Sequence, residues 1–338
     1  MEIQKTKIWL VLFSLLVVFG LAVGCGDDED VTMGNWTRMS DFDGLPRCDA
    51  VSFSIGTKGY VGTGYDGKED RLSDFWEYNT EKDYWTQKAD MPGSPRNGAV
   101  GFAVGSMGYV GTGWDGENDY NDFYQFNPAT NTWTRKADFP GTPRHGATGF
   151  GLDAKGYLGC GDDDNYLKDF YEYDPSSNTW TKIISIGGQK RRDATSFVIN
   201  GKGYVVSGID NGSYLDDLWM YDPATKEWTQ KRRISDSSDD DYDDDYTGIV
   251  RTSAVAFTIN GKAYLTLGSS SSLLSTTWQY DPSSDLWEEM TEFEGTIRTE
   301  AVGFAVGNYG YVTTGRSSSY YMDDIWRFNP VEEYDAEN

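Results

Sequence analysis

Residues 96–113 read RNGAVGFAVGSMGYVGTG, and the pattern in this stretch occurs six times along the chain. Each copy starts at an arginine, and Ala, Phe, Tyr and Gly follow it at distances of three, six, thirteen and seventeen residues. A Trp stands eleven residues before each arginine except Arg251, which Trp228 precedes by 23 residues. Successive arginines are 47 to 49 residues apart, except for one gap of 60. Such self-similarity predicts a repeat protein, and its anchors are Arg47, Arg96, Arg144, Arg191, Arg251 and Arg298.

Each copy predicts four short strands. In the second copy, the small and apolar residues 99–104 are followed by a turn and by a second strand over 108–113. A longer loop leads to alternating aromatic residues over 122–126, and a turn leads to Thr132-Trp133-Thr134. The aromatic content of 15% and the 39 glycines fit strands joined by many turns. We therefore expect an all-β protein with four antiparallel strands in each copy.

The repeated residues resemble kelch repeats. The shared features are the arginine before the first strand, the Tyr and Gly of the second strand, the Trp of the fourth strand and a Tyr-Asp-Pro turn. This turn stands at 173–175, 221–223 and 280–282. The sequence departs from the family where the kelch glycine doublet is reduced to Thr-Gly, Cys-Gly, Ser-Gly or Leu-Gly. Over about residues 35–330, the resemblance implies a six-bladed β-propeller of kelch type.

The two ends of the repeated region predict how the ring closes. An orphan fourth strand, Asn35-Trp36-Thr37, precedes the first complete copy. The last copy stops after its third strand, at Trp326-Arg327-Phe328. The two fragments add up to one blade. We therefore expect the N-terminal strand around Trp36 to complete the last blade, which also protects open strand edges.

The N-terminus looks like a bacterial lipoprotein signal. Two lysines precede an apolar run over residues 8–23, which is shorter than a membrane-spanning helix requires. Small residues then lead to Cys25 as in a lipobox, although Ala22 stands where Leu is usual. A plain secretory signal and an uncleaved anchor are the alternatives. The acidic residues 27–30 resemble an export signal that directs lipoproteins to the cell surface.

These features divide the chain into four expected segments. They are a signal peptide over 1–24, an acidic tether over 25–34, the propeller over 35–331 and an acidic C-terminal tail over 332–338. We expect a monomeric outer-membrane lipoprotein, held by the lipid on Cys25 and displayed on the cell surface. The inner face of the outer membrane is the alternative. The net charge of −25 argues against a nucleic-acid partner.

Differences between the copies locate the candidate binding face. A residue that is identical in every copy mostly builds the blade, whereas a position that differs can serve a ligand that lacks sixfold symmetry. The loops after the second strands differ, and variable loops on a rigid scaffold often carry binding sites. The candidates in these loops are Tyr65, Trp114, Asp115 and Tyr320. The two positions after each arginine also differ, and the candidates there are Asp49, Asn97, His145, Asp193 and Glu300.

The six arginines allow two interpretations. The kelch resemblance places them where the innermost strand of each blade begins, around the mouth of the central channel. They either bond carbonyl groups of a neighbouring blade or form an electropositive ring that binds the carboxylate of a ligand. Both interpretations stay open, and the six arginines are therefore included among the ligand-binding candidates.

The expected function is recognition without catalysis, with a glycan or a protein as the ligand. Aromatic rings beside carboxylates suit sugars, because rings pack on C–H faces and carboxylates accept hydrogen bonds from hydroxyls. The alternative is a sugar mutarotase or epimerase, similar to six-bladed kelch propellers that act on sialic acid. A carboxylate such as Glu300 would then act as acid and base near the arginines.

No cofactor is expected, apart from the possibility of calcium. His145 is the only histidine, which excludes a multi-histidine metal centre such as the copper site of kelch oxidases. The 12-residue insertion in the long gap is rich in aspartate. It is either a solvated charged loop or a calcium loop, and the candidate ligands are Asp239, Asp241, Asp243 and Asp245.

Overall fold

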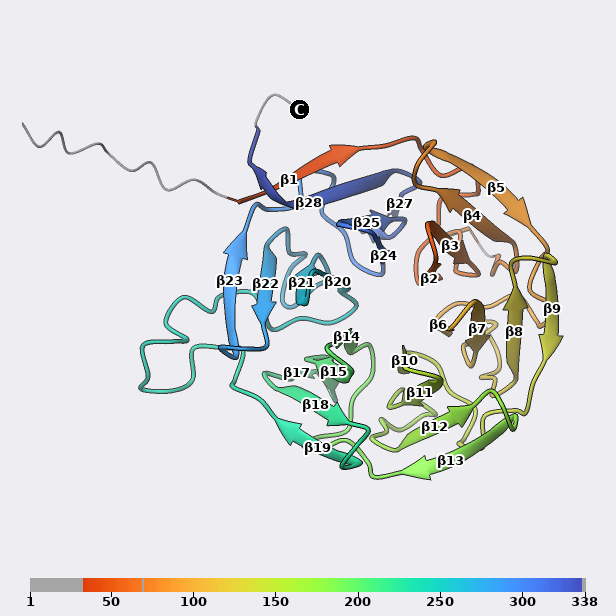
Figure 1. The fold of residues 1–338 in the computed structure, drawn as a ribbon, viewed down its shortest axis with the longest axis horizontal. Helices are drawn as coiled ribbons and strands as arrows, with labels where there is room; N and C mark the ends of the chain where they lie inside the picture. The colour runs from red at the N-terminus through yellow and green to blue at the C-terminus, as the bar shows by residue number, and fades with distance from the viewer. Residues whose placement is uncertain (1–32, 69, 336–338) are drawn as a thin grey trace, which may run out of the picture. The chain divides into compact units, whose positions relative to one another are not determined.

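The computed structural model describes residues 33–68 and 70–335, which form six four-stranded antiparallel sheets arranged in a ring (Figure 1). The expected signal peptide and the lipid attachment residue Cys25 lie outside these residues. The described part of the chain contains no helix, and so it has none that is long and apolar enough to cross a membrane. The prediction of an all-β, six-bladed propeller is confirmed.

Blades one to three are each built from four consecutive strands, with the strand beside the channel first. Blade one consists of β2 (Val51–Ile55), β3 (Lys58–Gly62), β4 (Phe75–Asn79) and β5 (Tyr84–Lys88). Blade two consists of β6 (Val100–Val104), β7 (Met107–Gly111), β8 (Phe123–Asn127) and β9 (Thr132–Arg135). Blade three consists of β10 (Thr148–Leu152), β11 (Lys155–Gly159), β12 (Phe170–Asp174) and β13 (Thr179–Ile183).

Blades four to six follow the same order outwards from the channel. Blade four consists of β14 (Thr195–Ile199), β15 (Lys202–Val206), β18 (Leu218–Asp222) and β19 (Glu227–Gln230). Blade five consists of β20 (Val255–Ile259), β21 (Lys262–Thr266), β22 (Thr277–Asp281) and β23 (Leu286–Met290). Blade six consists of β24 (Val302–Val306), β25 (Tyr309–Thr313), β28 (Ile325–Glu333) and β1 (Met33–Arg38).

The ring closes in blade six, where the first strand of the chain pairs with the last. β1 lies antiparallel to β28, with Trp36 opposite Phe328. Trp36 is fully buried, and its ring centroid lies 4.7 Å from that of Phe328 and 4.9 Å from that of Phe293. The predicted closure is therefore confirmed. β28 continues to Glu333, into the segment that was expected to be a tail.

The repeated aromatic residues pack neighbouring blades together. Trp133 of blade two lies 5.0 Å from Phe75 of blade one, and its Nε1 donates a hydrogen bond to the carbonyl of Ala89. Trp133 is half-buried in β9, the outermost strand of its blade, whereas Trp85 at the equivalent position of β5 is buried. Small residues in the second strands let the blades approach. A Cβ on Gly108, for example, would lie 2.1 Å from the ring of Phe53.

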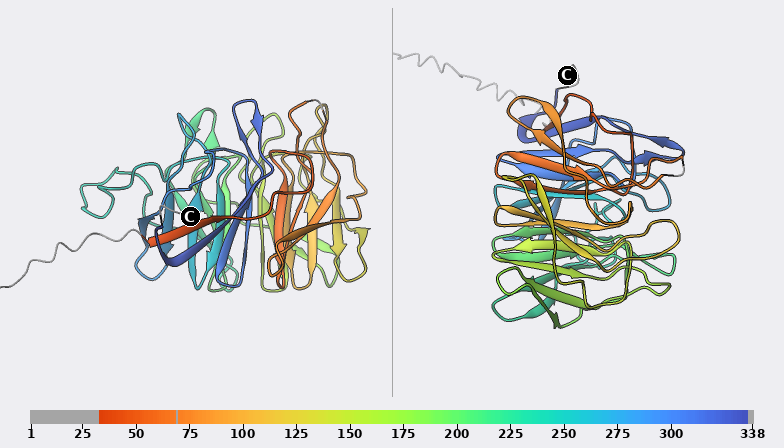
Figure 2. Two further views of the ribbon diagram at one scale, coloured as in Figure 1. Left: turned by 90° about the horizontal axis from the view of Figure 1, so that it is seen from above. Right: turned by 90° about the vertical axis from the view of Figure 1, so that its right-hand side faces the viewer.

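The two faces of the ring differ in their connections (Figure 2). Short turns join the first strand to the second and the third to the fourth, whereas longer loops follow the second strands on the other face. Two of these loops form small hairpins of their own. In blade four, β16 (Ile209–Asp210) pairs with β17 (Ser213–Tyr214), and in blade six, β26 (Arg316–Ser317) pairs with β27 (Tyr320–Tyr321). We call this side the loop face.

The aspartate-rich insertion projects from the rim between blades four and five (Figure 1). Its two ends are anchored by the buried residues Ile234 and Tyr246. The hydroxyl of Tyr246 accepts a hydrogen bond from the backbone N–H of Trp287 at 2.7 Å. Asp243 is fully buried and accepts hydrogen bonds from the backbone N–H groups of Ser237 and Ser238. The insertion is therefore an anchored loop with its remaining aspartates at the surface.

Candidate functional site

The six repeated arginines form a buried layer below the loop face. Each guanidinium is at most 1% exposed, and its Nη1 donates to the carbonyl of the residue sixteen positions later in the same blade. In five blades the guanidinium also holds the aspartate that precedes the third strand. These pairs are Arg47–Asp74, Arg96–Asp122, Arg144–Asp169, Arg191–Asp217 and Arg298–Asp324.

This layer corrects the interpretation of the arginines as ligand-binding residues. Their guanidinium groups are enclosed by carbonyl and carboxylate oxygens, so they form no electropositive ring for a ligand. They also bond carbonyls of their own blade rather than those of a neighbouring blade. A buried charge is stable only when it is paired and hydrogen-bonded, which explains why arginine and aspartate recur together.

Blade five departs from this arrangement. Thr276 occupies the position that aspartate holds in the other blades, and both its carbonyl and its hydroxyl accept hydrogen bonds from Arg251. Further bonds go to the carbonyls of Leu267 and Gly248. Burial lowers the pKa of Arg251 to about 9, which still leaves the group charged at neutral pH. The Arg251 guanidinium is therefore surrounded by carbonyl and hydroxyl oxygens, and no carboxylate of the described residues is hydrogen-bonded to it.

Directly above the arginines, six residues form a closed ring of backbone hydrogen bonds around the channel. Each blade contributes one residue, and the N–H of each residue donates to the carbonyl of the equivalent residue in the preceding blade at 2.8 to 3.2 Å. All six have positive φ angles between 51° and 62°. They are Asp49, Gly98, Gly146, Asp193, Ser253 and Glu300. The ring fixes the backbone of the channel mouth in every blade.

Three of these six residues place carboxylates at one small cavity. Asp49, Asp193 and Glu300 line a hollow of about 130 Å³ at the channel mouth. A Cβ on Gly146 would lie 2.5 Å from Oδ1 of Asp193, so a larger residue there would displace this carboxylate. Burial, followed by the charges of Glu300 and Asp193, raises the pKa of Asp49 to about 7. Burial likewise raises the pKa of Asp193 to about 6, although Arg192 opposes it.

Two arginines next to the ring pair with its other carboxylates. Arg316 holds Glu300 through two hydrogen bonds of 2.7 and 2.6 Å. Arg192 lies 3.3 Å from a carboxylate oxygen of Asp193 and 3.2 Å from one of Asp162. Asp49 instead accepts a hydrogen bond of 2.7 Å from Nδ2 of Asn97. The mouth thus combines charges of both signs with amide groups.

Asn97 and His145 connect the mouth to the loops. Oδ1 of Asn97 accepts a hydrogen bond from Nε of Arg71 at 3.1 Å. Nδ1 of His145 lies 2.8 Å from a carboxylate oxygen of Asp119, and the His145 side chain is 29% exposed. Both residues were candidates from the sequence, and the structure places both of them at the mouth of the channel. Arg71 was not a candidate.

The aromatic candidates in the loops are arranged around arginines. Arg71 lies between Tyr65 and Trp114, at 4.7 and 4.6 Å from the two ring centroids. One face of each ring is therefore already covered by a guanidinium. Asp115 organises its own loop, because it accepts hydrogen bonds from two backbone N–H groups and from the hydroxyl of Tyr120. Tyr320 is the freest of the set, with 68% of its surface exposed.

Arg71 and Arg316 were not among the candidates from the sequence. For Arg316 a signal existed, because the residue directly after the repeated glycine of the second strand differs in every blade. In order, these residues are Tyr65, Trp114, Asp162, Ile209, Ser269 and Arg316. Each of them bridges to the residue that follows the arginine. For Arg71, which comes from the far end of a long loop, no such repeated position exists.

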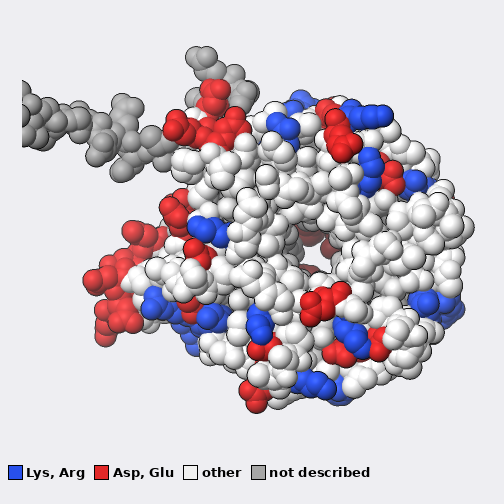
Figure 3. Space-filling model, in the orientation of Figure 1, with Lys and Arg blue, Asp and Glu red and all other residues white. Residues whose placement is uncertain are grey.

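The channel below the mouth is lined by small side chains. Two further hollows, of about 230 and 370 Å³, follow it through the ring, with walls of alanine, glycine, serine and valine and, at the wider end, phenylalanine. The channel stays open in the middle of the ring, and atoms of Asp or Glu residues are visible deep inside it (Figure 3). These atoms are consistent with the carboxylates at the mouth.

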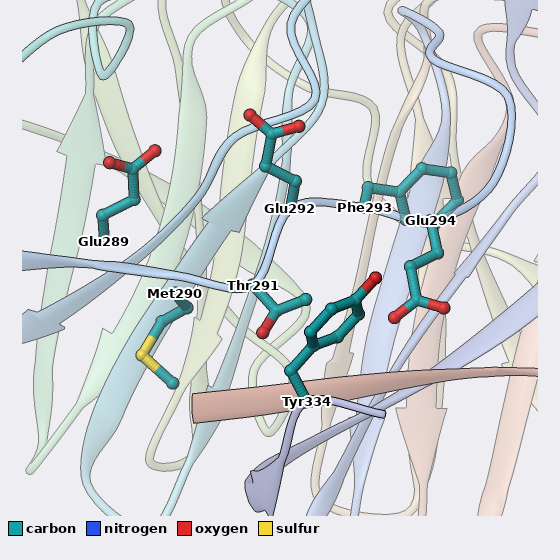
Figure 4. A pocket seen from close by; sticks show the side chains of 7 residues that line it. All are labelled: Glu289, Met290, Thr291, Glu292, Phe293, Glu294 and Tyr334. Carbon is teal, nitrogen blue, oxygen red and sulfur yellow. The ribbon is translucent and has the colours of Figure 1, made fainter. Parts of the chain in front are cut away.

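A more voluminous hollow than the mouth, of about 840 Å³, lies away from the loop face. It is an open groove on the outer edge of blade five, between β23 and Tyr334 of the C-terminal segment (Figure 4). Glu289, Glu292 and Glu294 line it together with Phe293. Its residues belong to one blade edge and one terminus, so it does not draw on several blades as the mouth does.

The insertion does not bring the four calcium candidates together. Among the described residues, the acidic groups close enough to share an ion are Asp236, Asp243 and Asp244. Only Asp243 belongs to the predicted set, and its carboxylate is occupied by hydrogen bonds from Ser237 and Ser238. The grouping of Asp239, Asp241 and Asp245 with Asp243 is therefore wrong, because the loop folds around the buried Asp243.

The repeated arginine layer, the ring closure and the blade packing define a kelch-type propeller. A family model described as the KLHDC2/KLHL20/DRC7 Kelch-repeats domain matches residues 30–191 and 159–300. The chain therefore belongs to the Kelch-repeat family. Among solved structures, one described as "Structure of YjhT" is similar with a TM-score of 0.71 and 15% identity, over 85% of this chain and 95% of that one. This likeness shows a common fold. None of the curated proteins compared matches the chain significantly.

Proposed function

We propose that the chain is a non-enzymatic recognition module whose loop face binds a glycan. One observation carries this proposal: the residues that differ between blades meet around the channel mouth, directly above a buried layer that repeats. Rigid scaffolds with variable loops commonly bind ligands in this way. A protein ligand for the same face is the alternative outcome of the tests below.

The chemistry of the mouth suits a hydroxyl-rich ligand better than a carboxylate. The mouth offers acceptors on Asp49, Asp193 and Glu300, and donors on Asn97 and Arg192. Its arginines are engaged by carboxylates of the protein, so a second carboxylate would have to compete for them. Sugar hydroxyls both donate and accept, and they can bond to such mixed groups without a change in charge.

A glycan array probed with the purified chain tests this proposal. Trp114→Ala should weaken binding with little loss of stability, because Trp114 lies in a loop at the mouth. Trp133→Ala should do the opposite, because Trp133 packs blade two against blade one. An array without a binder would refute glycan recognition and leave a protein as the expected ligand. Binding that survives changes at Trp114, Asp115, Tyr65 and Tyr320 together would place the site elsewhere.

We further propose that the propeller is tethered to the outer membrane through a lipid on Cys25 and is displayed on the cell surface. The support is the order of basic, apolar and small residues before Cys25, followed by acidic residues 27–30. Cys25→Ala should abolish lipidation and release the protein from the membrane fraction. Retention of this variant in the membrane at high salt would contradict the proposal. Protease added to intact cells distinguishes display on the surface from the inner face of the membrane.

A sugar mutarotase or epimerase is the second candidate. The observation that favours it is Asp49, because burial and neighbouring carboxylates raise its pKa to about 7, where a group can both donate and accept protons at neutral pH. The rate of interconversion between the α and β anomers of a reducing sugar, followed by NMR, tests the mutarotase activity. A rate equal to that of buffer alone would refute it.

A further inference from the structure

A cleft separates the loops of blades six and one, outside the channel mouth. Its volume is about 260 Å³, and blade six contributes Tyr321 and Ser319. Blade one contributes Asp66 and Lys68, and the linker before its arginine contributes Leu45 and Pro46. The cleft is thus formed across the junction at which the ring closes, from three segments that are distant in the sequence.

One wall of the cleft is a tyrosine ring held in place by backbone. Gly67 packs directly against Tyr321, since a Cβ on Gly67 would lie 2.0 Å from that ring. Gly67 also has a φ of +80°, which disfavours any larger residue. The rings of Tyr65 and Tyr321 lie edge to face, at 5.9 Å between their centroids. Tyr321 is therefore a fixed wall rather than a mobile surface side chain.

Leu45 and Pro46 make a second part of the lining apolar, and Leu45 is 52% exposed. The polar groups of the cleft come from the turn of blade one. Oδ1 of Asp66 accepts hydrogen bonds from the backbone N–H groups of Lys68 at 2.8 Å and Asp70 at 3.2 Å, which orients the carboxylate. Ser319 adds a hydroxyl. One carboxylate and one ammonium balance each other, so the cleft selects neither anions nor cations.

We propose that this cleft binds a single neutral sugar ring, as one residue of the glycan recognised by the loop face. A pyranose is apolar on its C–H faces and polar around its edge, which matches an aromatic and aliphatic lining with a few oriented polar groups. The volume is below the roughly 300–1,000 Å³ of pockets for drug-sized ligands, which favours one ring over an extended segment. The inference rests on the proposed function and locates its sugar subsite.

Blade four supplies a matched control within the same chain. Its hairpin of β16 and β17 carries Tyr214 at the position that Tyr321 occupies in the hairpin of β26 and β27. The hydroxyl of Tyr214 donates to the carbonyl of Ser270 in the loop of blade five. Tyr214→Ala therefore removes an equivalent ring from an equivalent hairpin, but away from the cleft.

The experiment measures saturation-transfer NMR between the purified full-length chain and methyl glycosides of glucose, galactose, mannose and N-acetylglucosamine. We expect saturation of the C–H protons of at least one of these sugars. Tyr321→Ala should weaken its binding at least tenfold, Tyr321→Phe should retain it because the ring remains, and Tyr214→Ala should leave it unchanged. Thermal unfolding of each variant verifies that the ring is intact.

The remaining outcomes separate this inference from the proposed function. Binding that survives in Tyr321→Ala but is lost in Trp114→Ala would overturn the cleft and leave recognition by the loop face intact. Equal losses in Tyr321→Ala and Tyr214→Ala would also overturn it, since a general effect of the hairpins would then be responsible. If none of the four glycosides binds while the glycan array detects a ligand, the inference of a neutral sugar fails. If the array is blank as well, glycan recognition itself fails.

Discussion

The buried arginine layer and the channel mouth above it occupy adjacent positions in the sequence but behave differently. The arginine of each repeat is enclosed by its own blade, whereas the next two residues face the channel and the loops. The first position is the same in six blades, and the other two differ. A single step along the backbone thus separates the residues that build the ring from those available to a ligand.

Blade five shows how far the framework tolerates change. Its arginine is buried like the others, although Thr276 replaces the aspartate that neutralises the charge elsewhere. Carbonyl and hydroxyl oxygens surround it instead. The repeated element is therefore the buried arginine itself, and the ion pair is the usual but not the only way of accommodating it.

The largest expected effect concerns the closure of the ring. Deletion of residues 26–38 removes β1 and with it the buried Trp36, which as a single large side chain stabilises a protein by roughly 3–5 kcal/mol. That is a large part of the typical free energy of unfolding of about 5–15 kcal/mol. The variant should unfold at a much lower temperature or aggregate through the exposed edge of β28. An unchanged melting temperature would show that β1 is dispensable for closure.

Next in size is the contrast between a framework arginine and a mouth arginine. Arg144→Ala leaves the carboxylate of Asp169 without its partner in a largely buried position and should cost about 3–5 kcal/mol. Arg192→Ala, one blade further on at the mouth, should cost about 1 kcal/mol or less because that side chain is 33% exposed. Urea unfolding of both variants measures the difference. Equal losses would erase the distinction between the two layers.

A smaller effect is expected from the titration of Asp49. Its pKa is about 7 in the folded protein and close to 4 in the unfolded chain, so folding favours the protonated form. The stabilisation that this provides is complete below pH 4 and is lost as the pH rises through 7. Asp49→Asn should therefore raise stability at pH 8 relative to its effect at pH 4. Parallel pH profiles for the two proteins would contradict the raised pKa.

The smallest expected effect is a repair of blade five. Thr276→Asp places a carboxylate where the other blades have one, beside a guanidinium that is already buried. The desolvation of Arg251 is already part of the folded state, so the new ion pair should add about 1 kcal/mol of stability. Thr276→Asn, which has a similar shape but no charge, serves as the control. Equal melting temperatures for both variants would show that the carbonyl dipoles already balance the charge.

The fold could be predicted from the sequence because a propeller repeats one local solution. Arginine, tyrosine, glycine and tryptophan recur at fixed spacings, and the two terminal fragments add up to one blade. The placement of Asp49, Asn97 and His145 at the mouth also followed from their position beside the arginines. What repeats six times in a sequence can be recognised without knowing where it lies in space.

The charge of the site could not be predicted in this way. The sequence left open whether the arginines face a ligand, because the aspartates that enclose them stand 25 to 27 residues later, across two strands and a loop. Likewise, Tyr321 and Gly67 meet only because the last blade closes on the first.

The sequence by itself determined the number of blades, the strands of each blade and the strand that closes the ring, because these depend on residues at fixed distances along the chain. Only the tertiary structure decided which charges are buried and which face a ligand. The free energy of a charge depends on the oxygens and nitrogens packed around it, and most of these come from other strands, other loops or the neighbouring blade. The arginines therefore became framework, and the carboxylates beside them became the mouth.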